Sequence, residues 1–145
     1  MTTIINVHAV PIEYVVATWY IAEPFIVSGL REGGSEDPVN MTYTSDNVLE
    51  YLLSGDWELF IAVGEDGAMK GAATVSYITY PLHCIAFITS VGGRLVANQD
   101  SFAQIKQLLK QRGATIIQCY GRPGIIRLWK RFNFQPRSTL LEAIL

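Results

Sequence analysis

Few residues of this 145-residue chain have the types and spacing that chemistry requires. The two cysteines, Cys84 and Cys119, lie in apolar, strand-like surroundings and belong to no CxxC or His/Cys cluster. The two histidines, His8 and His83, are isolated. Because protein metal sites are built from clusters of such ligands, the sequence predicts no metal site. The cysteines are expected to be small, buried hydrophobic residues.

Charge divides the chain into two unlike parts. Residues 1–70 carry eleven acids and two bases (−9), and residues 71–145 carry two acids and nine bases (+7), which together give the net charge of −2. The bases gather between Lys106 and Arg137. Such a segment can bind an anionic cofactor, nucleic acid or an acidic partner, or can neutralise the acidic part within one domain. The pI of 5.6 and the lack of a helix-turn-helix, RRM or OB signature argue against nucleic acid.

Composition and length fit one globular domain over residues 1–145. Half of the residues are apolar and 17% are charged, a balance far from that of disordered chains. The longest apolar stretches, such as residues 14–21, fall short of the ~20 residues that a membrane-spanning helix needs. The first residues contain neither a basic region nor an apolar core, so no signal peptide is expected. The sequence therefore predicts a soluble protein that stays in the cytoplasm where it is made.

The first part of the chain is predicted to form one strand and three helical pieces. Residues 3–10 alternate in polarity as a strand does, and Pro11 ends them. Residues 12–21 predict a largely buried helix, and Pro24 predicts the start of a second helical piece that ends near Gly29. The glycines and proline of residues 31–43 predict a surface loop. Thr44 and Ser45 then suit the N-cap of a helix that ends at Gly55.

The rest of the chain alternates strands with helices. Strands are predicted over residues 57–63, 70–80, 84–91, 115–120 and 137–145, with a hairpin turn at 65–67. A helix capped by Asp100 and Ser101 ends at Gly113, and another covers residues 125–132. The order is β-α-α-β-β-β-α-β-α-β. It predicts an α/β fold with a mixed, mostly antiparallel central sheet flanked by helices, in which the strands around the 101–112 helix are parallel neighbours.

This order and one C-terminal motif resemble the GNAT (N-acetyltransferase) superfamily. Many of its members end in a helix of the form N-x-x-A-x-x-x-Y-x-x-x-G-F, and residues 122–134 have the same frame. The matching positions are Arg122, Ile125, Trp129, Asn133 and Phe134. The Gly-Arg-Pro-Gly turn at 121–124, residues 52–59, residues 80–82 and the pair Gly92-Gly93 resemble small bacteriophage-encoded GNAT-like proteins.

The resemblance implies acetyl-CoA as the cofactor. In this fold the pyrophosphate binds backbone N–H groups at the start of the helix after the fourth strand. Gly92, Gly93 and Arg94 stand there and are the predicted cofactor-binding residues, with Arg122 and Trp129 from the C-terminal motif. The family's glycine spacing is absent, however, and Asp100 at the helix start would repel a phosphate. A turn with a surface arginine is the alternative interpretation.

Acid–base residues are sparse in the segment where the family places them. Residues 71–99 contain no Asp or Glu, so Glu58 and His83 are the remaining candidates for a general base. The family's acidic tyrosine is replaced by Trp129, whose indole N–H cannot deliver a proton. Tyr120 is the candidate substitute. The alternatives are a solvated Glu58, an ordinary loop His83 and a Tyr120 that packs against a helix.

The sequence leaves two functions open. The first is a phage-type GNAT-fold protein that acts by binding, either as a virion component or as an accessory protein directed at a host protein. Such a role needs exposed aromatic side chains, and the candidates are Trp19, Tyr20, Phe25, Trp57 and Trp129. The alternative is that these aromatic residues belong to the core. The second is an active acetyl-CoA-dependent N-acetyltransferase acting on a small amine or a protein amino group. The expected partner is a protein, with a homo-oligomer as a further option and no membrane.

Overall fold

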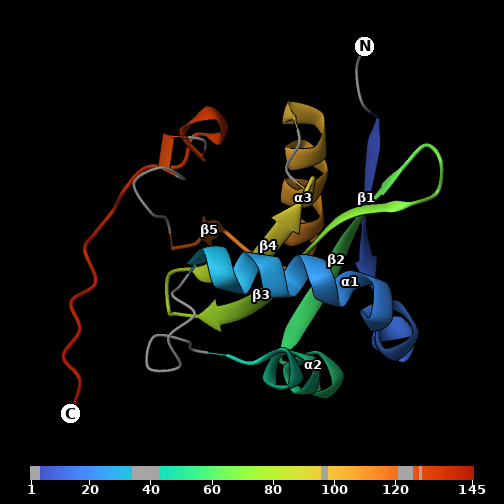
Figure 1. The fold of residues 1–145 in the computed structure, drawn as a ribbon. Helices are drawn as coiled ribbons and strands as arrows, with labels where there is room; N and C mark the ends of the chain where they lie inside the picture. Colours follow the sequence, from blue (N-terminus) through green and yellow to red (C-terminus); the bar gives the residue numbers. More distant parts are fainter. Residues whose placement is uncertain (1–3, 34–42, 96–97, 121–125, 128) are drawn as a thin grey trace.

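A five-stranded sheet forms the centre of the protein (Figure 1). The computed structural model describes residues 4–33, 43–95, 98–120, 126–127 and 129–145. The strands lie in the order β1-β2-β3-β4-β5 and are β1 (Ile5–Val10), β2 (Trp57–Gly64), β3 (Met69–Thr79), β4 (Cys84–Gly93) and β5 (Ile116–Gln118). The first four are antiparallel to their neighbours, whereas β5 is parallel to β4. This confirms the predicted fold class and the predicted parallel pair.

Helices cover both faces of the sheet. Helix α1 (Ile12–Gly33) and helix α2 (Ser45–Ser54) lie on one face, and α3 (Gln99–Gln111) lies on the other (Figure 1). The alternation of the strands explains the two layers, because successive side chains point to opposite faces. Phe60 and Ala62 of β2 belong to the cluster on the α3 face, and Leu59 belongs to the cluster beneath α1 and α2.

Helix α1 is one continuous helix, so the prediction of two pieces divided at Pro24 was wrong. A proline inside a helix removes one backbone hydrogen bond and costs ~3 kcal/mol. Burial on both sides of it offsets that cost, since Val15, Trp19, Ala22 and Ile26 all lie in the core beneath the helix. Tertiary packing has therefore overridden the local signal.

The helix ends follow capping chemistry. Thr44 is the N-cap of α2, as predicted, with a reciprocal capping box to Asn47, and Gly55 closes the helix in the left-handed conformation (φ 85°). The N-cap of α3 is Asn98 rather than the predicted Asp100 and Ser101. Ser101 is the N3 partner of that capping box. The prediction missed Asn98 because Asn98, Asp100 and Ser101 are all N-cap residue types and lie within four positions of one another.

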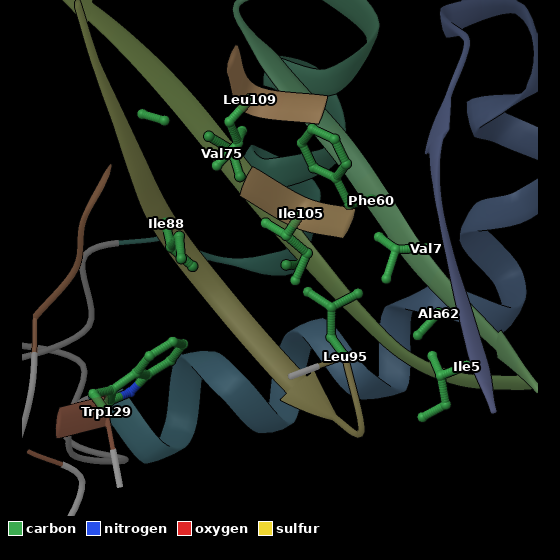
Figure 2. Close-up of a cluster of buried hydrophobic side chains, with 12 residues drawn as sticks. Ile5, Val7, Phe60, Ala62, Val75, Ile88, Leu95, Ile105, Leu109 and Trp129 are labelled. Atoms are coloured by element: carbon green, nitrogen blue, oxygen red, sulfur yellow. The ribbon is translucent and has the colours of Figure 1, made fainter. Parts of the chain in front are cut away.

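The larger hydrophobic cluster lies between the sheet and α3 (Figure 2). Phe60 of β2 is fully buried at its centre and points from the sheet toward Ile105 and Leu109 of α3. Trp129 closes the end of the cluster near Ile88 (Figure 2). This cluster ties the C-terminal part of the chain to the sheet.

The C-terminal prediction needs correction. Of the predicted helix over 125–132, residues 125 and 128 lie outside the described residues, and the short 3-10 helix η1 (Lys130–Phe132) closes the segment. The predicted strand over 137–145 is wrong, because these residues carry no regular secondary structure. Leu140, Leu141 and Ile144 are exposed there. Their apolar pattern favours a strand, but a strand requires a hydrogen-bonded neighbour, and within the described chain none lies beside them.

Candidate functional site

The strands β4 and β5 diverge at a β-bulge, and this divergence marks the candidate site. Residues 85–87 of β4 pair with residues 116–118 of β5, and the pairing stops there although β4 continues to Gly93. The register between β3 and β4 shifts just beyond this point, so Thr89 has no direct partner on β3. Its Oγ1 lies 2.7 Å from Oγ1 of Thr74 and donates to the Thr74 carbonyl at 3.0 Å. Bulges bend strands next to binding sites, and ligands bind where the carboxyl ends of parallel strands separate.

The predicted phosphate residues at the end of β4 pack closely against other backbone. A Cβ on Gly92 would lie 2.8 Å from the Phe25 carbonyl carbon of α1, and one on Gly93 would lie 2.7 Å from the Phe25 ring. The N–H of Arg94 donates to the Lys70 carbonyl at 2.8 Å. Packing alone therefore explains why both positions are glycine, because α1 and β3 approach β4 too closely to leave room for a side chain.

The N-terminus of α3 is occupied by its own side chains. The Ser101 N–H donates to Oδ1 of Asn98 at 2.9 Å, and the Asn98 N–H donates to Oγ of Ser101 at 3.2 Å. The Asp100 carboxylate accepts a hydrogen bond from Gln104 at 3.0 Å. A helix N-terminus attracts a phosphate through its N–H groups and positive dipole. Here a capping box uses the N3 N–H group, and a carboxylate adds negative charge in the first turn.

A broad groove of about 1460 Å³ runs between α3, β5 and the C-terminal segment. Lys106 and Lys110 of α3 line it together with Trp129 and Tyr120. The Tyr120 ring packs edge-on against Phe87 of β4 at 5.0 Å between centroids, so this contact is with a strand and not with the helix that the alternative interpretation expected. Trp129 is buried and packs against Phe134 at 4.9 Å. Arg122 lies outside the described residues.

Glu58 is held by a network that the sequence did not reveal. Arg112 at the end of α3 donates to both carboxylate oxygens, with Nη2 to Oε2 at 2.8 Å and Nε to Oε1 at 2.9 Å. The Tyr77 hydroxyl donates to Oε1 at 2.7 Å. Burial, followed by the hydrogen bond from this hydroxyl to Glu58, raises the pKa of Tyr77 well above its usual value. The network ties α3 to β2 and β3, and a small pocket of about 210 Å³ lies beside Glu58 and Tyr77.

Removing the charge of Glu58 is expected to destabilise the protein. Glu58→Gln loses the bidentate pairing and leaves Arg112 without its charged partner, so the free energy of unfolding should fall by about 1–2 kcal/mol. Chemical denaturation monitored by circular dichroism measures this. Asp66→Asn, which breaks the exposed Lys70–Asp66 pair in a turn, is the control and should leave the unfolding midpoint unchanged. Equal effects of the two variants would contradict the structural role of the Glu58 network.

The remaining candidate residues lie apart from one another. His83 follows β3 in a loop and places Nδ1 3.1 Å from Oγ1 of Thr115. Among the described residues, no hydrogen bond joins Glu58, His83 and Tyr120. Burial raises the pKa of Cys119, beside Tyr120, to about 11, so its thiol stays protonated at neutral pH.

A slow reaction of Cys119 with iodoacetamide follows from this pKa. An unperturbed thiol has a pKa near 9.0, so it is about half thiolate at pH 9, whereas a pKa of about 11 leaves ~1%. Alkylation of Cys119 in the native protein at pH 9 should therefore be ~50-fold slower than in denaturant. Mass spectrometry of tryptic peptides follows the reaction. Equal rates in the native and denatured protein would show that burial does not protect the thiol.

Sequence reasoning missed the partners of the site residues because they come from distant positions. Arg112 lies 54 residues from Glu58 in the chain, and only its place before a helix-ending glycine marks it. The Ser90 hydroxyl donates to the Ile26 carbonyl at 2.8 Å and fixes α1 on β4 from 64 residues away. No local pattern pairs such residues. Thr89 likewise gives no signal in the sequence that it forms a bulge.

Two kinds of feature are absent from the described residues. No group of three or more His, Cys, Asp or Glu side chains could hold a metal ion. Within the same ranges, no helix combines the length and the apolar character needed to cross a membrane.

Comparison with solved structures identifies the architecture. No family model and no curated protein matches the sequence. A predicted acetyltransferase from Clostridium acetobutylicum, crystallised with acetyl-CoA, superposes with a TM-score of 0.63 at 16% identity over 97% of this chain and 96% of its own. A GCN5-related N-acetyltransferase from Ralstonia eutropha gives 0.64 at 16% identity over 97% and 98%. An aminoglycoside acetyltransferase from an uncultured soil metagenomic sample gives 0.64 at 15% identity over 100% and 99%. At these identities the likeness is one of fold, and the chain has the fold of the GNAT acetyltransferases.

Proposed function

We propose that this chain uses the GNAT fold as a protein-binding scaffold and does not turn over acetyl-CoA. The observation that carries the proposal is the N-terminus of α3, where Asn98 and Ser101 cap the helix and Asp100 adds a carboxylate. An enzyme of this fold needs that helix end for the cofactor pyrophosphate. A phosphate there would have to displace the capping box and approach a negative side chain.

The end of β4 supports the same proposal. The N–H of Arg94 is already bonded to Lys70, and the space in front of Gly92 and Gly93 is filled by Phe25. Among the described residues of this segment, the fit to a pyrophosphate is therefore poor. The acid–base candidates support it too, since the Glu58 carboxylate is paired with Arg112, accepts a hydrogen bond from Tyr77, and makes no hydrogen bond to either His83 or Tyr120.

The partner is proposed to be a protein, either a virion component or a host protein. This choice rests on the resemblance of residues 52–59, 80–82 and 121–124 to small bacteriophage-encoded GNAT-like proteins. The proposal places the protein in the cytoplasm of the host cell or in the virion.

Titration with acetyl-CoA tests the proposal. Calorimetry should detect no heat of binding up to millimolar cofactor, and the melting temperature should not rise, because only a ligand that binds the native state stabilises it. A Kd near micromolar, together with a rise in melting temperature that follows the concentration of acetyl-CoA, would overturn the proposal. Coenzyme A without the acetyl group is the control for adventitious phosphate binding.

A working N-acetyltransferase is the second candidate, and the groove beside α3 favours it. This groove is large enough for a cofactor and carries Lys106 and Lys110, which could pair with phosphates. The bulge at Thr89 supports it as well, because it bends β4 where β4 and β5 separate. Under this function, Arg94→Ala and the double change Lys106→Ala/Lys110→Ala should each weaken acetyl-CoA binding severalfold in the calorimeter.

A further inference from the structure

The aromatic residues predicted for an interface do not form one. Trp19, Trp57 and Trp129 are buried, and Phe25 is half-buried, so these four belong to the cores. Tyr20 alone of the five is exposed. A single exposed ring makes no interface core, in which several aromatic residues usually gather. The edges of the sheet offer a different kind of surface.

The edge of the sheet at β1 is covered by a side chain of α3. Strands β1 and β5 lie at opposite edges of the sheet (Figure 1). The Val7 N–H donates to Oε1 of Gln104 at 2.8 Å, and Nε2 of Gln104 donates to the Ile5 carbonyl at 2.8 Å. The Gln104 amide therefore takes the place of a neighbouring strand, and this part of the β1 edge is closed to another chain.

The edge at β5 has no such cover among the described residues. Thr115, just before β5, donates its N–H to the Cys84 carbonyl at 2.8 Å. Successive residues of a strand direct their backbone groups to opposite edges, so those of Ile116 and Gln118 face away from β4. Within the described ranges, these outward N–H and C=O groups have no hydrogen-bond partner. Such an edge is a template for a strand from another chain.

The open edge lies in the broad groove beside α3. All three residues of β5 line this groove of about 1460 Å³, together with residues of α3 and residues 137–140. Pockets for small molecules usually measure ~300–1,000 Å³. The size of the groove therefore suits an extended segment of polypeptide.

The groove is basic. Its described lining contains Lys106, Lys110 and Arg137 and no Asp or Glu. Both lysines are exposed, and neither takes part in a salt bridge within the described chain. A segment that carries carboxylates into the groove would form ion pairs that the described chain does not itself supply.

We propose that the groove binds an extended acidic segment of a partner protein, which adds to the sheet as a strand beside β5. Backbone hydrogen bonds to Ile116 and Gln118 hold the segment, and every second side chain points toward α3. Lys106 and Lys110 lie about one turn apart, ~6 Å along α3. Alternate residues of a strand are ~6.6 Å apart, so carboxylates two residues apart match the spacing of the lysines. This inference rests on the proposed function and names the chemistry of its protein partner.

Binding of a designed peptide to the full chain tests the proposal. The probe is a short, blocked, fluorescent peptide in which Glu and Val alternate, and anisotropy measures its affinity. A Kd of ~100 µM or tighter is expected from a few backbone hydrogen bonds and two ion pairs. The same peptide with Lys in place of Glu should bind at least ~10-fold more weakly, because it meets like charges.

A double substitution tests the role of the two lysines. Lys106→Ala/Lys110→Ala should raise the Kd of the Glu–Val peptide at least ~10-fold. Lys130→Ala removes an exposed base that does not line the groove, so it is the matched control and should leave the Kd unchanged. Circular dichroism checks that each variant is folded. Equal effects of the double substitution and the control would overturn the proposal.

Hydrogen exchange followed by NMR separates strand addition from charge attraction. Saturating peptide should slow exchange of the Ile116 and Gln118 amides at least ~10-fold, because each gains a backbone partner. The Val7 amide, already bonded to Gln104, is the internal control and should exchange at an unchanged rate. A bound peptide that leaves Ile116 and Gln118 unprotected would overturn strand addition.

Further outcomes separate this proposal from the proposed function. Absence of peptide binding at millimolar concentration would overturn the inference, while absence of acetyl-CoA binding in the same sample would leave the scaffold function standing. Micromolar binding of acetyl-CoA without binding of the peptide would overturn both. Tighter binding of a short thymidine oligonucleotide that depends on Lys106 and Lys110 would overturn the inference in favour of a nucleic acid.

Discussion

Gly92→Ala is expected to lower the free energy of unfolding by ~3 kcal/mol, the upper end of the usual range for overpacking in a close-packed interior. The added methyl group would overlap the backbone carbonyl of Phe25, and backbone cannot move aside as a flexible side chain can. Helix α1 would have to lift from β4 and would lose the hydrogen bond from Ser90 to the Ile26 carbonyl. Urea denaturation followed by circular dichroism measures the loss.

Gly67→Ala is the matched control for this substitution. Gly67 lies in the β2–β3 turn with φ 78°, and a methyl group there would meet nothing within 4 Å. The cost is then only that of a left-handed alanine, ~1 kcal/mol. If Gly92→Ala cost no more than Gly67→Ala, the close contact between α1 and β4 would be wrong, and Gly92 would again be free to serve a phosphate.

Trp129→Ala is expected to cost ~3–5 kcal/mol, as truncation of a large buried aromatic residue does. The indole closes the cluster on the α3 face and packs against Phe132 and Phe134. Its loss would leave a cavity beside Ile88 at the end of the cluster shown in Figure 2. Thermal or urea denaturation gives the difference from the wild type.

Leu140→Ala is the control for Trp129→Ala, since Leu140 is 71% exposed in the same C-terminal part of the chain and should change stability little. The comparison separates two roles of Trp129. A large loss of stability in the absence of any cofactor supports a core residue. A small loss, comparable to that of Leu140→Ala, would contradict the packing described for Trp129 and favour the predicted role in binding a cofactor.

The sheet and its flanking helices could be predicted because their signals are local. Alternating apolar residues mark β2 to β4, Gly67 marks the turn between β2 and β3, and Thr44 and Gly55 mark the ends of α2. Each signal lies within a few residues of the feature that it predicts. The parallel pairing of β4 and β5 then follows from the handedness of strand–helix–strand connections.

The secondary-structure predictions were wrong where contacts with residues far away in the chain decide whether a helix or strand forms. Pro24 breaks a helix locally, but burial of Trp19 and Ile26 keeps α1 continuous. Residues 137–145 are rich in apolar side chains, yet strand formation depends on a neighbouring strand and not on composition.

The candidate site was harder to predict than the fold. Gly92 and Gly93 are typical of a phosphate loop in sequence, and only the position of Phe25 reveals a packing reason for them. Glu58 was a candidate general base in the sequence, but its binding to Arg112 and Tyr77 joins residues far apart in the chain and has no local signal. Function in this fold depends on what surrounds a residue as much as on its type.

An NMR titration decides whether the fold is kept for binding and not for acetyl-CoA chemistry. Amide signals of a uniformly ¹⁵N-labelled sample would be followed while acetyl-CoA is added to millimolar concentration. We expect the signals of Gly92, Gly93, Arg94, Asn98 and Asp100 to stay in place. Progressive shifts that cluster on these residues and saturate would contradict this expectation, because they would place the cofactor at the end of β4 and the start of α3.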